Sequence, residues 1–184
     1  MPATPTEQEL LQRCLKGDAQ AQYRLYEQYV TAMYNTAIRI VVLPADAEDV
    51  LQESFTKVFA QLHRFRNEST IGAWIKRIVL NTALHHLRAR KRLQFAELDA
   101  GQDVADDGPN SDSAWDAATL HEAVKQLPNG CRVVFSLYVI EDMGHKDIAA
   151  ALGISESTAK TQYMWAKKLL KAHLLALKNV ENIE

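Results

Sequence analysis

Apolar residues recur three and four positions apart through most of this chain, and this spacing constrains its fold more than any other feature. The clearest run lies in segment 46–62, where the apolar positions are Ala47, Val50, Leu51, Phe55, Val58, Phe59 and Leu62. An α-helix turns once in 3.6 residues, so these side chains would share one face. Only 7 Gly and 5 Pro occur among 184 residues, which argues against a turn-rich β fold. The sequence therefore predicts an all-α protein.

One acidic stretch interrupts the helical pattern. Residues 96–114 contain six acidic and no basic residues, several Gly, Pro and Ser residues, and almost nothing to bury. We expect this stretch to be a flexible acidic linker between two small helical domains, at 8–95 and 115–178. A chain of 184 residues is long enough for two such domains.

Breaks in the periodicity place the ends of individual helices. Gly17-Asp18 separates two amphipathic segments near the N-terminus, and Pro44 ends the second one. Asp46 is a candidate N-cap for the helix that follows. A polar loop at 66–70 precedes a long helix expected at 71–92. In the second domain we expect helices at 120–127, 132–139, 146–152 and 157–177.

Two adjacent helices carry opposite charge. On the first, Asp46, Asp49 and Glu53 fall on one face, with Gln52 alongside. Segment 63–92 then holds eight basic residues and one acidic residue, a net charge of +7. Opposite surfaces on neighbouring helices suggest two partners, nucleic acid for the basic one and a protein that recognises carboxylates for the acidic one. The simpler alternative for the acidic face is solvated charge.

The basic segment mixes aromatic and basic side chains at helical spacing. The positions that share a face are Trp74, Arg77, Asn81, His85, Arg88 and Arg92. An exposed tryptophan beside arginines can stack on unpaired bases while the guanidiniums hold phosphates, and an asparagine can pair with a base edge. Alternatively, Trp74 belongs to the core and the arginines solvate a helix end.

Residues 147–171 have the form of a helix-turn-helix. The small residues of a short first helix are followed by Gly153 for the turn, Ile154 as a plug and Ser155 as a cap. The side chains expected to meet DNA on the second helix are Ser157, Thr158, Lys160, Thr161, Met164 and Lys168. The opposite face packs through Ala159, Tyr163, Ala166 and Leu170. A plain helical hairpin with a solvated lysine face is the alternative.

The cysteines and the lengths of the apolar runs indicate in which cellular compartment the protein works. Cys14 and Cys131 lie far apart without a ligand pattern, so we expect reduced thiols rather than a disulfide or a zinc site. No apolar run approaches the length of a membrane span, and the N-terminal residues do not resemble an export signal. We expect a cytoplasmic protein without membrane insertion.

Two other classes of protein would account for part of this sequence. A metal enzyme could recruit carboxylates and histidines such as Asp49, Glu53 and His63, but the sequence lacks the Glu-x-x-His pairs of helical di-metal sites, and His85 and His86 are adjacent, so they point in different directions. We therefore expect no enzyme activity, no metal and no cofactor.

A DNA-binding regulator with a sensory first domain would explain the helix-turn-helix but not the acidic and basic helices.

These motifs together resemble the extracytoplasmic-function sigma factors, the small bacterial sigma subunits of RNA polymerase. Five motifs carry the resemblance, and they occur in the same order as in the family. In the first domain they are Gly17-Asp18 with Ala21, Leu25, Tyr26 and Tyr29; Asp46-Ala47-Glu48-Asp49 with Gln52-Glu53 and Phe55; and Trp74-Ile75 with Ile78, Asn81, Arg88 and Arg92. In the second domain they are Leu127-Pro128 with Arg132, Val133 and Phe135, and the helix-turn-helix. Each motif is weak alone, but five in sequence around an acidic linker are specific.

The resemblance implies a role for each surface. Asp46, Asp49, Gln52 and Glu53 would dock on the clamp helices of the polymerase β′ subunit. The −10 element would be bound and melted by Phe65, Arg66, Asn67, Trp74, Arg77, Asn81, Arg88 and Arg92. The helix-turn-helix would read the −35 element and touch the β flap, and the linker would run through the RNA exit path. The resemblance also implies an anti-sigma factor as a partner.

Some positions depart from the pattern of this family. His85 stands where an aspartate is frequent, and Gly144 stands where a serine often caps the first helix of the turn. Gln162, Trp165 and Lys167 stand at recognition positions that are often arginine, and Trp165 would either pack inside or contact the flap. These departures lie where promoter sequence specificity is set.

Overall fold

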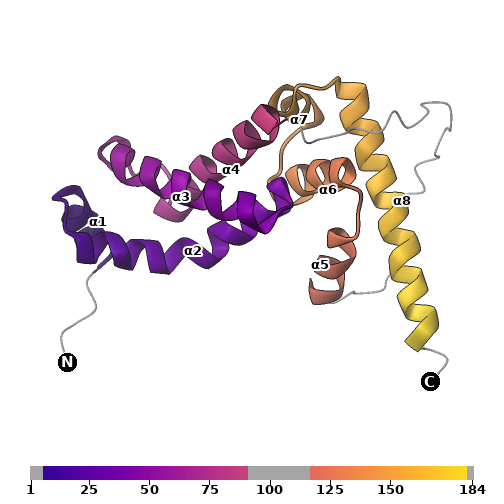
Figure 1. Ribbon diagram of the computed structural model, residues 1–184, viewed down its shortest axis with the longest axis horizontal. Coiled ribbons are helices and arrows are strands. Elements are labelled where there is room, and N and C mark those ends of the chain that lie inside the picture. The colour runs from indigo at the N-terminus through magenta and orange to yellow at the C-terminus, as the bar shows by residue number, and fades with distance from the viewer. Residues whose placement is uncertain (1–5, 91–116, 182–184) are drawn as a thin grey trace. The chain divides into compact units, whose positions relative to one another are not determined.

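Every regular element that the structure describes is a helix. The computed structural model describes residues 6–90 and 117–181, and the chain divides into two compact units between Ala89 and Arg90 (Figure 1). The predicted all-α fold with two helical domains is confirmed. The expected linker at 96–114 and the candidate site residue Arg92 lie outside the described residues.

The first unit opens with two helices joined by a tight turn. α1 (Glu7–Leu15) begins with a capping box, in which the Thr6 hydroxyl accepts from the Glu9 N–H at 3.3 Å and the Glu9 carboxylate accepts from the Thr6 N–H at 2.8 Å. The Asp18 carboxylate caps α2 (Ala19–Val41) by accepting from two backbone N–H groups of its first turn. The break predicted at this turn is confirmed.

α3 (Pro44–Gln61) begins earlier than the sequence suggested. Pro44 occupies the first turn and Leu43 is the N-cap residue, without a side-chain cap. Proline suits this position because its φ is already helical and its missing N–H would have no partner there. The prediction that Asp46 caps this helix is therefore wrong. Asp46 lies inside the first turn and is 3% exposed.

A short loop connects α3 to the last helix described in the first unit. After η1 (Leu62–Arg64), the polar loop leads into α4 (Ile71–Arg90), whose start matches the prediction. The Thr70 hydroxyl accepts from the Ala73 N–H at 3.2 Å and so caps α4. The core of the unit is formed by side chains from α1 to α4, and its largest fully buried members are Leu25, Ile40, Val50, Val58, Ile71, Ile75 and Val79.

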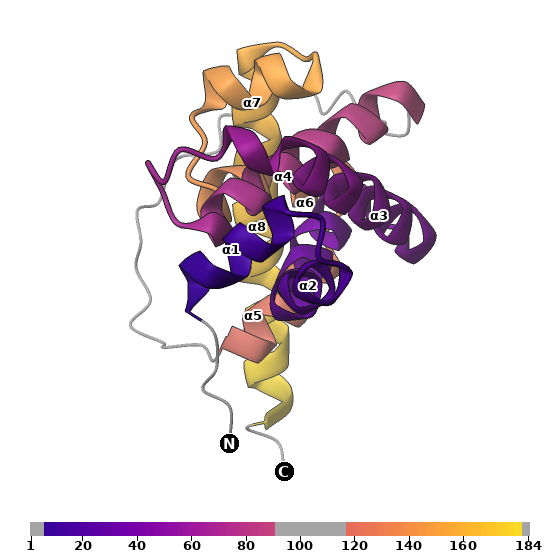
Figure 2. The same ribbon diagram turned by 90° about the vertical axis from the view of Figure 1, so that its left-hand side faces the viewer.

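The second unit packs short helices on one long helix. α5 (Ala117–Lys125) and α6 (Asn129–Phe135), which continues as a π-helical turn, η2 (Ser136–Ile140), precede the last two helices. α7 (His145–Leu152) packs at the N-terminal end of α8 (Glu156–Glu181) (Figure 2). The hydrophobic core joins α5, α6 and α8 through Ala123, Val124, Leu127, Cys131, Phe135, Ala166, Leu170 and Leu174.

The turn between α7 and α8 has the geometry expected of a helix-turn-helix. Gly153 ends α7 in the left-handed conformation, with φ of 70°. Ser155 then caps α8, because its hydroxyl accepts from the Thr158 N–H at 2.9 Å. The predicted roles of Gly153 and Ser155 are confirmed, and α8 leaves the turn in a fixed direction.

Replacing Gly153 tests how far the turn depends on its backbone conformation. An added Cβ at this position would meet no atom within 4 Å, so any cost comes from the positive φ alone. Gly153→Ala should lower the free energy of unfolding by about 1 kcal/mol, and Gly153→Asn should lower it less because asparagine tolerates this region better. Urea unfolding followed by circular dichroism measures both variants. An alanine variant as stable as the wild type would contradict this account of the turn.

Candidate nucleic-acid and protein interfaces

The acidic face of α3 is smaller than the sequence suggested. Asp49, Gln52 and Glu53 are exposed, as expected. Asp46 is not, because it lies on the inner side of the helix, one turn before the buried Val50. Its Oδ1 atom is 3.5 Å from Nε2 of His86 on α4. The expectation that Asp46 shares one exposed face with the other carboxylates is therefore wrong.

A lysine on α3 connects the remaining acidic face to α4. The Lys57 ammonium lies 2.7 Å from the Glu53 carboxylate, one turn away on the same helix. It also donates to the Thr82 hydroxyl of α4 at 3.2 Å. Thr82 is buried, at 2% exposure, so this bond reaches into the interface between the helices.

α4 presents the aromatic and basic face that its spacing predicted. Four side chains of this face are exposed: Arg77, Asn81, His85 and Arg88. Trp74 is half-buried, and its ring centroid lies 5.5 Å from that of Phe65, at an interplanar angle of 49°. The neighbouring loop adds the exposed residues Arg66 and Asn67, and Asn67 has a positive φ of 57°. Trp74 is therefore neither a fully buried core residue nor a freely exposed one.

The first turns of α8 carry a cluster of hydroxyls and ammoniums. The Ser155 hydroxyl lies 3.0 Å from that of Ser157 and 2.7 Å from that of Thr158, and Lys160 pairs with Glu156 at 2.7 Å. Further along the helix, Thr161 and Met164 are half-buried, whereas Lys168 is exposed. Hydroxyl and ammonium groups on one helix face are suited to phosphate oxygens and base edges.

Gln162 does not belong to this surface, although the sequence placed it at a recognition position. It is 3% exposed, and its side-chain carbonyl accepts from the Cys131 thiol at 3.1 Å. Burial raises the pKa of Cys131 to about 11, so the thiol keeps the proton that it donates. Gln162 therefore joins α6 to α8 in the core, and the expectation that it stands among DNA-facing residues is wrong.

Trp165 also contributes to packing. It is half-buried against the core of α5, α6 and α8. The Lys168 ammonium lies over its ring, 4.9 Å from the centroid, at a distance typical of a cation–π contact. Trp165 thus holds one of the predicted DNA-binding lysines at the edge of the recognition surface.

An aromatic cluster that the apolar spacing did not predict lies at the helix-turn-helix. The ring of His145, the first residue of α7, stacks on Tyr138 with centroids 4.5 Å apart and an interplanar angle of 16°, and it lies 5.4 Å from Tyr163 of α8. Burial, together with the nearby Lys160 ammonium, lowers the pKa of His145 below its ordinary value of 6.5. The cluster therefore favours a neutral imidazole.

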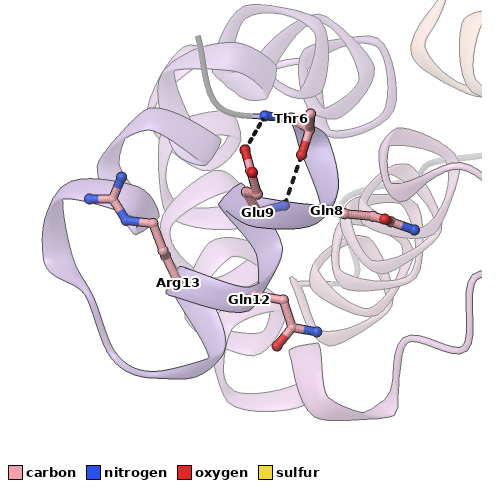
Figure 3. A pocket seen from close by; sticks show the side chains of 5 residues that line it. All are labelled: Thr6, Gln8, Glu9, Gln12 and Arg13. Carbon is pink, nitrogen blue, oxygen red and sulfur yellow. Dashed lines mark hydrogen bonds between the residues drawn. The ribbon is translucent and has the colours of Figure 1, made fainter. Parts of the chain in front are cut away.

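A hollow on α1 shows no comparable chemistry. It is lined by Thr6, Gln8, Glu9, Gln12 and Arg13 (Figure 3). Thr6 and Glu9 bond to each other across the capping box, as the dashed lines in Figure 3 mark, and Arg13 pairs with Asp18 at 2.8 Å. The charged groups of the hollow are thus engaged within α1 and the turn that follows it.

The described helices offer neither a metal site nor a membrane span. Within residues 6–90 and 117–181, no group of three or more His, Cys, Asp or Glu residues could hold a metal ion. Among the helices of the same ranges, none is both long and apolar enough to cross a membrane.

The geometry defines a two-unit helical protein with a helix-turn-helix and a separate helix of aromatic and basic side chains. The family Sigma-70 region 2 matches residues 25–93, and the family Sigma-70, region 4 matches residues 117–170. Together the two matches span about two thirds of the chain. The chain belongs to the extracytoplasmic-function sigma factors of bacterial RNA polymerase. Its function is that of a sigma factor in transcription initiation, and sigma factors are generally not catalytic enzymes.

The chain is similar to known sigma factors over most of its length. The RNA polymerase sigma-H factor of Pseudomonas aeruginosa is 29% identical over 183 residues, covering 93% of this chain and 95% of the relative. The ECF RNA polymerase sigma-E factor of Haemophilus influenzae is 28% identical over 178 residues, covering 90% and 94%. A solved structure of the sigma factor RpoE in complex with the anti-sigma factor NepR from Bartonella quintana has a TM-score of 0.46 and 23% identity, covering 83% and 95%.

The lowered pKa of His145 predicts a pH dependence of stability. The folded protein resists protonation of this ring, whereas the unfolded chain takes up the proton at the ordinary pKa near 6.5. The contribution of His145 to stability is therefore present above pH 6.5 and decreases as the pH falls below it. His145→Phe, which keeps a ring for stacking, should lose less stability than the wild type between pH 7.5 and pH 5.5.

Thermal unfolding of the full chain at both pH values measures this difference. His63→Phe is the control, because His63 is exposed and lies in the other unit, and it should keep the pH dependence of the wild type. Equal losses for the wild type and His145→Phe would contradict the assignment.

Proposed function

We propose that the exposed part of the acidic face binds the clamp helices of the polymerase β′ subunit. Asp49, Gln52 and Glu53 present two carboxylates and an amide to a basic or hydrogen-bonding partner, and they lie within the Sigma-70 region 2 match. The resemblance also assigned Asp46 to this contact. Because Asp46 is buried, it would support the surface from the interior, through its contact with His86. The observation that carries the proposal is that α3 and α4 of one unit expose surfaces of opposite character.

In the same proposal α4 binds and melts the −10 element. Trp74, backed by Phe65, would stack on an unpaired base of the non-template strand, and Asn81 would bond to a base edge. The guanidiniums of Arg77, Arg88 and Arg92, with Arg66 and Asn67 of the loop, would hold the strand. Stacking stabilises a bound base by about 1–3 kcal/mol, comparable to the few kcal/mol that unpairing costs, so binding alone can open DNA without a catalytic group.

The second unit would read the −35 element. Its contacts would come from the first turns of α8, through Ser157, Thr158, Lys160, Thr161, Met164 and Lys168. Mixed hydroxyl and ammonium groups and the N-terminal end of a helix support duplex binding, because both match phosphates along a groove. In this placement the unit would also contact the β flap.

The protein would consist of two domains joined by a linker that also meets the polymerase. We place the domains at 8–95 and 115–178, and the family matches at 25–93 and 117–170 fall inside them. The linker at 96–114 would run through the RNA exit path, a channel that accommodates a polyanion. An anti-sigma factor is a further partner that the family resemblance implies. The protein would act in the cytoplasm, where RNA polymerase works, without enzyme activity or a cofactor.

Charge reversal on α3 tests the polymerase contact. Asp49→Lys with Glu53→Lys should lower the affinity for core RNA polymerase by about tenfold or more, because rim charges facing a basic partner become repulsive. Both positions are exposed, so circular dichroism should show an intact helical fold. Run-off transcription with core polymerase should fall in parallel at limiting sigma factor.

The matched control for this reversal is Glu7→Lys with Glu27→Lys, at exposed positions on α1 and α2. Unchanged core affinity for the α3 variant would place the contact elsewhere. Tight duplex binding by a wild-type chain that fails to bind core polymerase would favour a helix-turn-helix regulator that is not a polymerase subunit.

Trp74→Ala tests the melting surface. Loss of one stacking platform should reduce the open complex by about 5- to 150-fold, at 1–3 kcal/mol per base, and change closed-complex binding little. Permanganate reactivity of unpaired thymines measures opening, and gel shift on duplex promoter DNA measures closed binding. Trp74→Phe, which keeps a smaller ring, should recover part of the loss. Equal losses at both steps would contradict the stacking role.

A further inference from the structure

Two polar contacts join α3 and α4, which lie side by side in the first unit (Figures 1 and 2). Lys57 Nζ donates to Thr82 Oγ1 at 3.2 Å, and Asp46 Oδ1 lies 3.5 Å from His86 Nε2. Thr82 and His86 are one helical turn apart, so both contacts meet the same side of α4. Of the described residues on these two helices, the buried polar ones are Asp46, Ser54 and Thr82, and two of these three take part in the contacts.

The Lys57 contact adjoins residues that the proposed function assigns to partners. The Lys57 ammonium is shared between Thr82 and the Glu53 carboxylate, which belongs to the acidic face of α3. Thr82 directly follows Asn81 on the DNA-facing side of α4. One charged group therefore links a carboxylate at the proposed polymerase surface to the residue next to a proposed base contact.

The direction of the bond from Lys57 matters because the other buried residues of α3 and α4 are mostly apolar. Burial of apolar area is favourable but non-directional, so it does not by itself fix how α4 is rotated about its own axis. A charge-assisted hydrogen bond is directional and stronger than a neutral one. The bond from Lys57 to Thr82 therefore favours the rotation in which Asn81 points outward beside Arg77 and Arg88.

We infer that Lys57 is a positioning residue that couples polymerase docking on α3 to the presentation of the DNA face of α4; this inference rests on the proposed function. A basic group of the polymerase that binds Glu53 competes with Lys57 for that carboxylate. The Lys57 ammonium is then left with Thr82, and the rotation of α4 is held more firmly once the polymerase is bound. The apolar core keeps α4 in the unit independently of Lys57.

The test separates core binding from DNA opening. Lys57→Met keeps the length of the side chain but removes its charge. The full-length variant should bind core polymerase at least as tightly as the wild type, because Glu53 loses its competitor, while open-complex formation at saturating holoenzyme falls about five- to tenfold. Fluorescence anisotropy measures the affinity, and permanganate reactivity measures opening.

Three variants complete the experiment. Lys57→Arg, which keeps a charged donor, should recover much of the opening, and Lys16→Met, at an exposed lysine following α1, should change neither quantity. Thr82→Val removes the acceptor with little change of shape, and its effect on opening should not add to that of Lys57→Met, since both remove one bond. If Lys57→Met strongly lowers the melting temperature, core affinity and open-complex formation are compared in Thr82→Val instead.

Several results would overturn the inference. These are unchanged opening in Lys57→Met, equal losses of core affinity and opening, and additive effects of the two substitutions. Failure of the proposed function is distinguishable, because it appears with the α3 charge reversal and Trp74→Ala even when Lys57→Met behaves as stated. A purely structural role for Lys57 would lower the melting temperature and both binding steps together.

Discussion

The shared apolar core of α1 to α4 is the constraint on which the functional surfaces of the first unit depend. Each helix buries one stripe and exposes the opposite one, so the core fixes which residues face a partner. On α4 the buried residues include Ile75, Val79, Ala83 and Leu87, and the exposed ones include Arg77, Asn81, His85 and Arg88. The surface that would hold DNA is thus the direct complement of the surface that holds the unit together.

In the second unit, α8 likewise has one buried face and one exposed face. Its inner face closes the core through Ala159, Ala166 and Leu170, and its outer face carries the hydroxyls and ammoniums. The two faces meet at Trp165, which packs on the core and places its ring under the Lys168 ammonium. Trp165 therefore connects the core of this unit to the recognition surface.

The helical faces could be predicted from the sequence because periodicity reports each helix by itself. The exposed side of α4, the turn at Gly153 and the packing face of α8 all follow from spacing and from local backbone preferences. Asp46 and Gln162 could not be placed in this way. Their partners, His86 and Cys131, stand on other helices, Cys131 31 residues away in sequence, and a pattern of apolar spacing carries no information on such pairs.

Two buried polar residues, Gln162 and Thr82, join helices that must keep a fixed orientation. A polar group without a partner would destabilise the fold, so Gln162 with Cys131 and Thr82 with Lys57 are retained only where the helices keep their register. Gln162 holds the recognition helix α8 to α6, and Thr82 holds α4 to α3. In both units, then, the helix expected to meet DNA is the one fixed by a hydrogen bond from a neighbouring helix. Apolar packing sets which face is exposed, and these bonds set the direction in which it points.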